Sequence, residues 1–178
     1  HNFDEVEKML RKDSTLINKN EENTPTRDLP IITAIQSVKN KKDEGTEEAD
    51  AAFNMFKYLL RKRTIDIMAK TKLKTNALFF AMNQNLPNVV QALVNKEPRL
   101  LNVKTVQGQI GISNSEVGLT PLGLARKRYS TYPTSNLSEI IEILANPPQR
   151  RPLNPFSRRQ GRRQGGKRFT KKRKKRKY

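Results

Sequence analysis

Apolar residues recur along the first 146 residues at the spacing of amphipathic helices. In four stretches they fall at i, i+3 and i+4, which places them on one face of a helix. Each stretch closes with an apolar pair: Met9-Leu10, Leu59-Leu60, Leu93-Val94 and Ile143-Leu144. The second members of these pairs lie 50, 34 and 50 residues apart. The pattern predicts an all-α chain with a repeat of about 33 residues and two insertions of about 17 residues.

A second landmark precedes the last three pairs. It reads LPIITA at 29–34, NALFFA at 76–81 and TPLGLA at 120–125. The hydroxyl of Thr120 can accept a hydrogen bond from a free N–H at a helix start, and Pro121 loses no donor there. We therefore expect a helix to begin at Thr120.

Polar residues mark the starts and turns of other expected helices. Asn2 with Glu5, and Asn136 with Glu139, each fit an N-cap followed three residues later by a capping glutamate. Asn85 stands where two helices should turn, and asparagine tolerates left-handed backbone angles. The sequence therefore predicts helix starts at Asn2 and Asn136 and a tight turn at Asn85.

These motifs resemble the ankyrin-repeat family over residues 2–146. TPLGLA matches the ankyrin helix start TPLHLA except at the histidine, and the copy at 76–81 continues to Val94 with the ankyrin spacing and no gap. The segments LIN, IDI and LNV, which end at residues 18, 67 and 103, resemble the stretch before an ankyrin β-turn finger. The resemblance implies an ankyrin-repeat solenoid of about three and a half helix-turn-helix repeats, in which stacked neighbours make the core. Its expected boundaries are a partial repeat at 1–24 and repeats at about 25–70, 71–105 and 106–146.

The chain also departs from the family pattern. The family histidine is replaced by Ile32, Phe79 and Gly123, so the side-chain bond that helps to fix the turn is absent. The insertion at 36–52 is rich in Lys, Asp and Glu, and it forms either a solvated loop or an extension of the two helices that it joins. Further insertions break the period at 106–117 and 129–135.

The first expected repeat is incomplete. Residues 2–18 resemble a second helix and finger with no first helix before them, and the chain has no initiating methionine. We therefore expect residues 1–178 to be the C-terminal part of a longer polypeptide. Its upstream part would cover apolar residues such as Phe3, Val6 and Met9.

Positive charge is concentrated at the C-terminus. The chain has 36 Lys and Arg against 17 Asp and Glu, a net charge of +19, and 15 of the basic residues but no acidic residue lie in 147–178. The first 146 residues therefore carry a net charge of only +4. The tail at 147–178 is rich in Pro, Gly, Arg and Lys and should be disordered on its own, because it cannot bury enough apolar surface to offset its ordering entropy.

Two uses compete for the cations of the tail. An import receptor would read extended Lys and Arg side chains, for which the run from Lys171 to Lys177 suffices. RNA or DNA would instead gain from counterion release, although Phe156, Phe169 and Tyr178 are too sparse to form a stacking platform. A solvated tail without a specific partner is the third reading. The candidate import or nucleic-acid residues are Arg158, Arg159, Arg162, Arg163, Lys167, Arg168, Lys171, Lys172, Arg173, Lys174, Lys175, Arg176 and Lys177.

The sequence lacks a constellation that fits catalysis. There is no cysteine, and the single histidine is His1, so we expect no catalytic residue, no metal site and no cofactor. The acidic residues at 43–50 lack the ligand pattern of a calcium loop, and the glycines at 108 and 111 are not followed by the Lys-Ser/Thr of a phosphate loop. Helical spacing predicts that five aromatic residues are mostly core rather than a ligand site: Phe53, Phe56, Tyr58, Phe79 and Phe80.

The ankyrin resemblance implies a protein-binding surface on finger tips and first-helix faces. Carried over by position, its contacts would be Lys19, Asn20, Glu21, Lys70, Lys72, Lys74, Lys104, Gln107 and Gln109. Lysines dominate this set, which indicates either an acidic partner surface or merely well-solvated tips.

We therefore expect a non-catalytic ankyrin module that binds a protein partner and meets an import receptor through its tail, without contacting a membrane. We expect the protein to lie in the nucleus, with the nucleolus as one option within it. If the tail is not an import signal, we expect the protein in the cytoplasm. One alternative is the docking end of a larger enzyme, such as a chromatin-modifying protein or a bacterial effector acting in a host nucleus. The other is a protein that binds nucleic acid through its basic tail.

Overall fold

The computed structural model describes residues 3–19, 29–41 and 46–147. These residues form seven α-helices and no strand, which confirms the all-α prediction. Three short 3-10 helices lie between them. The α-helices are α1 (Phe3–Lys12), α2 (Pro30–Lys41), α3 (Thr46–Arg61), α4 (Ala77–Asn83), α5 (Pro87–Lys96), α6 (Pro121–Thr131) and α7 (Ser135–Ala145), and the 3-10 helices are η1 (Ser14–Asn18), η2 (Pro98–Asn102) and η3 (Asn114–Glu116).

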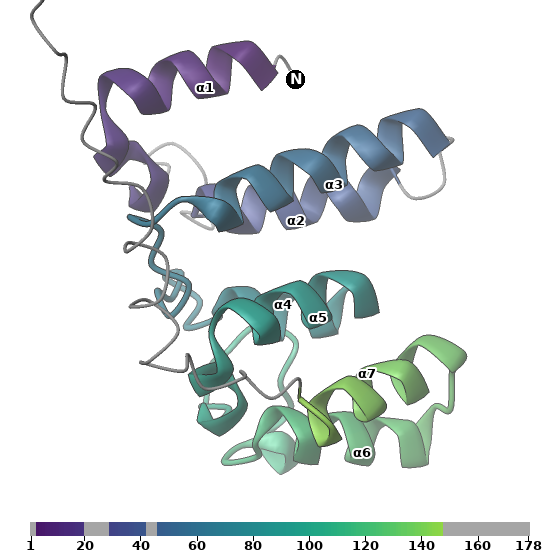
Figure 1. The fold of residues 1–178 in the computed structure, drawn as a ribbon. Helices are drawn as coiled ribbons and strands as arrows, with labels where there is room; N and C mark the ends of the chain where they lie inside the picture. Colours follow the sequence, from purple (N-terminus) through teal and green to yellow (C-terminus); the bar gives the residue numbers. More distant parts are fainter. Residues whose placement is uncertain (1–2, 20–28, 42–45, 148–178) are drawn as a thin grey trace, which may run out of the picture. The chain divides into compact units, whose positions relative to one another are not determined.

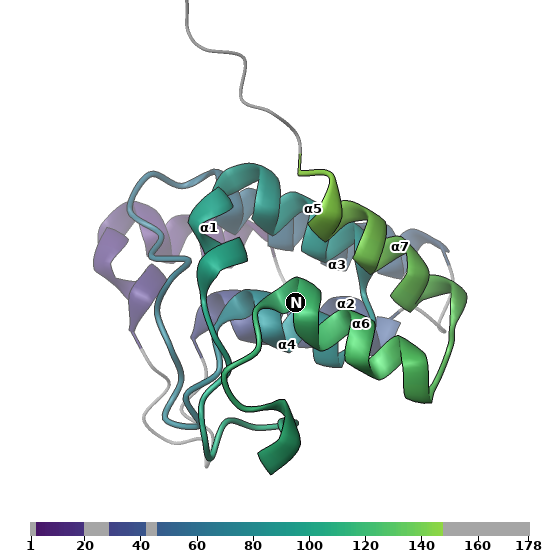
Figure 2. The same ribbon diagram turned by 90° about the horizontal axis from the view of Figure 1, so that it is seen from below.

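The helices from α2 onward form three antiparallel pairs, α2 with α3, α4 with α5, and α6 with α7 (Figure 1). The pairs stack so that α2, α4 and α6 make one layer and α3, α5 and α7 make a second layer (Figure 2). Helix α1 packs on η1, and η1 in turn contacts α2. No helix in the described ranges is long and apolar enough to span a lipid bilayer.

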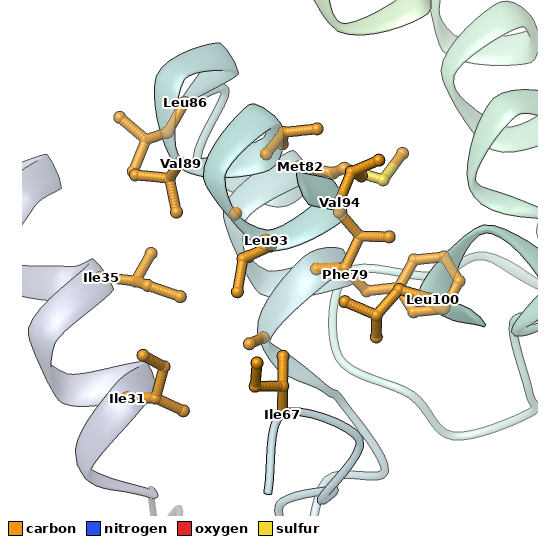
Figure 3. Packing of buried hydrophobic residues seen from close by; sticks show 14 of the residues in the cluster. Ile31, Ile35, Ile67, Phe79, Met82, Leu86, Val89, Leu93, Val94 and Leu100 are labelled. Carbon is orange, nitrogen blue, oxygen red and sulfur yellow. The ribbon is translucent and has the colours of Figure 1, made fainter. Parts of the chain in front are cut away.

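The core runs between consecutive helix pairs. Figure 3 shows Ile31 and Ile35 of α2 facing the next pair, where Val89 and Leu93 of α5 lie. All four side chains are buried, and burial of each stabilises the fold by about 1.5 to 3 kcal/mol. Because one pair alone would leave these side chains in water, the fold depends on stacking.

The aromatic residues expected in the core lie there. Phe56 and Phe79 are fully buried, and Phe53, Tyr58 and Phe80 are partly buried against the same cluster. The prediction that these rings are core residues is therefore confirmed.

The start of α6 is where the sequence predicts it. The hydroxyl of Thr120 accepts a hydrogen bond from Gly123 N at 3.2 Å, with Pro121 as the first helical residue. Helix α4 begins in the same way, since Asn76 Oδ1 accepts from Phe79 N at 3.0 Å. Both side chains satisfy an N–H that lacks an intrahelical acceptor.

The prediction of an N-cap at Asn136 is wrong. The N-cap of α7 is Thr134, whose hydroxyl accepts from Leu137 N at 3.2 Å. Thr134 has extended backbone angles, so the helix has already begun at Asn136. The side chain of Asn136 instead donates to the carbonyl of Asn85 at 3.3 Å and ties α7 to the turn between α4 and α5. The corresponding prediction at Asn2 lies outside the described residues.

Asn85 adopts the expected left-handed conformation, with φ of 57°. It forms the turn between α4 and α5, where Leu86 N donates to the carbonyl of Ala81 at 3.1 Å. The asparagine therefore permits a connection of three residues between antiparallel helices.

Of the two alternatives for the charged insertion, the structure favours longer helices. Helices α2 and α3 have 12 and 16 residues, against 7 and 10 in α4 and α5. The connection at 42–45 lies outside the described residues. The last insertion likewise extends α6 to Thr131, whereas the insertion at 106–117 forms a long loop.

The first helix leaves apolar side chains partly uncovered, as the sequence predicts. Met9 is 56% exposed, while Val6 and Leu10 are only partly buried. The side chain of Asn18 nevertheless links η1 to the segment after α3. Its Nδ2 donates to Thr64 O at 2.6 Å and its Oδ1 accepts from Asp66 N at 2.8 Å.

Candidate functional site

Two loops precede α4 and α6, and they hold most of the predicted contact residues. We name residues 70–76 loop A and residues 104–119 loop B. Loop A closes on itself, because Thr71 N donates to Thr75 O at 2.9 Å and Lys74 N donates to Thr71 O at 3.0 Å. Both threonines are buried, so Lys72 and Lys74 point outward from a fixed turn.

Thr105 closes the base of loop B. Its N–H donates to Leu119 O at 2.9 Å, and its carbonyl accepts from Gly118 N at 3.0 Å. Its hydroxyl also accepts from Leu119 N at 2.9 Å. Since Thr105 is buried, these bonds are shielded from water and hold the two ends of the loop together.

The two loops are bonded to each other. Ile110 N donates to the carbonyl of Leu73 at 3.3 Å, and Lys74 Nζ donates to the carbonyl of Gln107 at 3.2 Å. These bonds join residues of consecutive helix pairs, so loops A and B form one continuous surface.

Arg128 of α6 fixes the far side of loop B. Its Nε lies 2.9 Å from Glu116 Oε1, its Nη1 donates to Asn83 Oδ1 at 2.7 Å, and its Nη2 donates to the carbonyl of Gly111. Asn83, in the last turn of α4, also donates to the carbonyl of Ile110 at 3.0 Å. One guanidinium therefore joins loop B to both α4 and α6 through charge-assisted bonds.

The carboxylate of Glu116 is held ionised in this network. Burial opposes its charge, but hydrogen bonds from Arg128 and from the N–H and hydroxyl of Ser113 outweigh that cost, so the pKa of Glu116 lies below its ordinary value. The side chains of Arg128 and Glu116 are only 22% and 12% exposed. On the outer side, Lys127 Nζ donates to the carbonyl of Ser115.

A glycine is required where loop B crosses α4. Gly111 has φ of 70°, and a Cβ at this position would lie 2.5 Å from Asn83 Nδ2. Any other residue would have to displace the side chain that anchors the loop.

The structure brings together five of the predicted contact residues on loops A and B. Lys70, Lys72, Lys74, Lys104 and Gln107 are all exposed. By contrast, Lys19 follows η1, where its Nζ lies 3.5 Å from Asp13 Oδ2. Asn20 and Glu21 lie outside the described residues.

The prediction that Gln109 contacts a partner is wrong. Gln109 is only 4% exposed, and its Oε1 accepts from Val106 N at 3.1 Å. Loop B turns back at this point, because Gln109 N also donates to the carbonyl of Val106. The glutamine braces the loop from inside.

Charge is divided unevenly within residues 1–146. Residues 62–128 hold 11 Lys and Arg against 3 Asp and Glu, a net charge of +8. The rest of this region, residues 1–61 and 129–146, holds 10 basic against 14 acidic residues, a net charge of −4. Two of the three carboxylates in the basic segment, Glu97 and Glu116, are already paired with arginines.

Within the described part of the chain, three lysines of the loops have no neutralising partner. Lys70, Lys72 and Lys104 form no ion pair with any residue that the structure describes. None of the described carboxylates therefore neutralises their charge.

Residues that build the site were not identified from the sequence. No sequence motif marks Arg128, Asn83 or Ile110, because their roles arise from contacts between segments that are distant in the chain. A motif does mark Ser113 and Glu116, since a serine followed three residues later by glutamate fits a capping box.

An open groove of about 300 Å³ lies between α5 and α7, in the layer that does not contain α4 and α6. Three amide side chains and two carboxylates line it, together with Ile143: Asn88, Gln91, Asn146, Glu139 and Glu142. Across the described part of the chain, no group of three or more His, Cys, Asp or Glu side chains is placed to hold a metal ion.

Comparison with known proteins provides no further guide to function. No protein-family model, curated protein or solved structure matches this chain.

Proposed function

We propose that this chain is a non-catalytic protein–protein interaction module of ankyrin type, which a C-terminal polybasic signal directs to the nucleus. The observation that carries the proposal is the stack of three helix pairs whose preceding loops, A and B, are hydrogen-bonded to each other. An array of this kind offers a protein partner a broad, rigid surface.

The sequence motifs support the ankyrin assignment independently of the helix count. The TPLGLA segment supplies a capped helix start at Thr120, and Asn85 forms the turn between α4 and α5. The apolar pairs that end α3 and α5 are 34 residues apart, close to one ankyrin repeat.

The chemistry of loops A and B favours binding over catalysis. Their side chains supply exposed ammonium groups and amides, and they contain neither a histidine nor an unpaired carboxylate. Such groups recognise a charged surface through charge and hydrogen bonds. An acidic protein surface is the partner that they fit.

The nuclear part of the proposal rests on sequence, because residues 148–178 lie outside the described part of the chain. The run of seven cations from Lys171 to Lys177 is long enough for an import receptor to read in extended form. The pairs Arg158-Arg159 and Arg162-Arg163 provide a second, separable cluster.

Localisation in eukaryotic cells tests the nuclear assignment. Fluorescent fusions too bulky for passive nuclear entry would be compared for the full chain and for a version that ends at Asn146. We expect only the full chain to be nuclear, and neutralisation of 171–177 to glutamine should abolish import. Neutralisation of the four arginines at 158, 159, 162 and 163, which removes four charges instead of seven, is the comparison variant and should leave import in place. If the full and shortened chains distribute alike, the import signal is refuted, and salt-dependent nucleic-acid binding becomes the leading account of the tail.

Site-specific photo-cross-linking tests the binding assignment. A benzophenone amino acid would replace Lys72 on loop A or, as a control, the exposed Glu139 on α7. We expect discrete protein adducts from position 72 and none from position 139. Absence of protein adducts from position 72, with or without adducts from position 139, would contradict a binding surface on the loops.

A further inference from the structure

Loop B is bonded to α4 and α6 on the outer side of the layer that they share with α2. Figure 2 shows the loop with η3 on the side of α4 and α6 that faces away from α5 and α7. Its tip is held at Ile110 by Asn83 of α4 and at Gly111 by Arg128 of α6. A loop fixed from two helices loses little entropy on binding, so its outer surface is preorganised for a ligand.

The tip of loop B exposes an apolar side chain, and its backbone is bonded to loop A between two lysines. Ile110 is 43% exposed. Its N–H is bonded to the carbonyl of Leu73, the residue between Lys72 and Lys74. Lys70 and Lys104 stand at the starts of the two loops. A single exposed isoleucine is ordinary on a protein surface, but here it sits on a fixed backbone within a segment of net charge +8.

We infer that loops A and B form a docking surface for an acidic protein segment that places an apolar side chain against Ile110. The inference rests on the proposed function, because it names the chemistry of the partner that the module would bind. Carboxylates of the partner would meet Lys70, Lys72 and Lys104, whose ammonium groups have no ion partner among the described residues. The charges steer and orient the segment, and the apolar contact discriminates between acidic segments.

The composition of the loops favours a protein segment over a nucleic acid. Loops A and B contain no aromatic residue on which a base could stack. They also contain no arginine, the side chain whose fork matches a phosphate with two hydrogen bonds. Lysines around an isoleucine provide point charges and an apolar contact, which an acidic and partly apolar peptide satisfies.

Peptide binding to the full chain tests the inference. The probe is a fluorescein-labelled peptide of four Glu-Glu-Leu triplets, and its partner probe has serine in place of every leucine. Because the basic tail attracts any polyanion, the comparison is between variants of equal net charge. K70E/K72E/K104E removes the charge of the loops, while K8E/K12E/K39E changes exposed lysines of α1 and α2 by the same amount.

We expect the loop variant to bind the leucine peptide about tenfold more weakly than the unmodified chain, and the control variant to differ by less than about threefold. Ile110→Ser should weaken binding of the leucine peptide about fivefold and leave the serine peptide unchanged. Met9→Ser, which alters an exposed apolar residue of α1, should affect neither peptide.

Three results would overturn the inference. The two triple variants could weaken binding equally, which would assign the affinity to net charge. The unmodified chain could bind both peptides equally well, which would show that an apolar contact does not contribute to binding. A DNA duplex matched in charge could instead lose affinity with the loop variant as strongly as the peptide does, which would make the loops a phosphate-binding surface.

Cross-linking separates this inference from the proposed function. A photoreactive version of the leucine peptide would be mapped on the full chain by mass spectrometry. Labels around positions 72 and 110 support the inference. Labels on another face of residues 1–147 would refute it but leave a protein-binding module intact, whereas labels only within 148–178 would count against both.

Discussion

Loops A and B occupy equivalent places before α4 and α6, yet they are stabilised in different ways. Loop A is a tight turn closed by bonds within the loop, between Thr71, Lys74 and Thr75. Loop B is longer, and beyond its base at Thr105 it depends on Arg128 and Asn83, which belong to two helices. The conformation of loop A is therefore a local property of the chain, whereas that of loop B is a property of the stack.

Removal of Arg128 should break this comparison most strongly. Arg128→Ala removes the guanidinium that donates to Glu116 Oε1 and Asn83 Oδ1, both partly buried, and we expect a loss of about 2 to 4 kcal/mol in unfolding free energy. Amide hydrogen exchange should accelerate through loop B and stay unchanged in loop A. Arg126→Ala, an exposed neighbour on the same helix, should cost less than about 0.5 kcal/mol. Equal acceleration in both loops would show that they are not independent.

A methyl group at Gly111 tests the crossing of loop B over α4. Gly111→Ala combines a left-handed backbone angle with a contact of 2.5 Å to Asn83, so we expect a loss of about 2 to 3 kcal/mol by urea denaturation. Gly118→Ala is the control, since it has φ of 83° but open space around a Cβ, and it should cost only about 1 kcal/mol. If the two variants lose the same stability, the close approach to Asn83 does not constrain the loop.

Acidification should destabilise loop B but not loop A, by a smaller amount than the two substitutions above. The pKa of Glu116 is lowered in the folded chain, so the stability it contributes is present above the unfolded glutamate pKa of about 4.3 and is lost as pH falls through the folded value. Below about pH 4, loop B should therefore exchange its amides faster, after correction for intrinsic rates. Loop A contains no carboxylate and should not respond directly. In Glu116→Gln this extra pH dependence should be absent, and its persistence would assign the effect to another group.

The smallest expected effect is a gain in loop A. Lys74 has φ of 59°, an angle that asparagine adopts more readily than lysine. Lys74→Asn should raise stability by about 0.3 to 0.5 kcal/mol, which a calorimeter would detect as a small rise in melting temperature. Lys72→Asn, which does not change a left-handed residue, is the control. A drop in stability for Lys74→Asn would mean that the bond from Lys74 to Gln107 contributes more than the backbone strain.

The features that could be predicted from the sequence are those that short segments determine. The hydroxyl of Thr120 caps α6 within three residues, and Asn85 turns the chain by its own backbone preference. The burial of Phe56 and Phe79 follows from helical spacing. In each case the residues that decide the structure are neighbours in the chain.

The two errors have different physical causes. Thr134 and Asn136 lie two residues apart, and both are residue types that cap helices well. The sequence alone does not indicate which of the two precedes the first residue of the helix. Gln109 has the polarity of a surface residue, but the fold of loop B turns it inward. That fold depends on Arg128, 19 residues further along the chain, so no local pattern could have indicated it.

The bonds between loop B and Arg128 have a further consequence when they are viewed as a binding equilibrium. The loop offers the guanidinium one carboxylate and one carbonyl, the same acceptors that a peptide ligand would offer. Because both ends of the loop are tethered, this internal ligand is present at an effective concentration on the order of millimolar or above. An external peptide that competes for Arg128 must overcome that effective concentration, so Arg128 should stay bonded to loop B. The lysines of the loops are then the groups that a partner can bind.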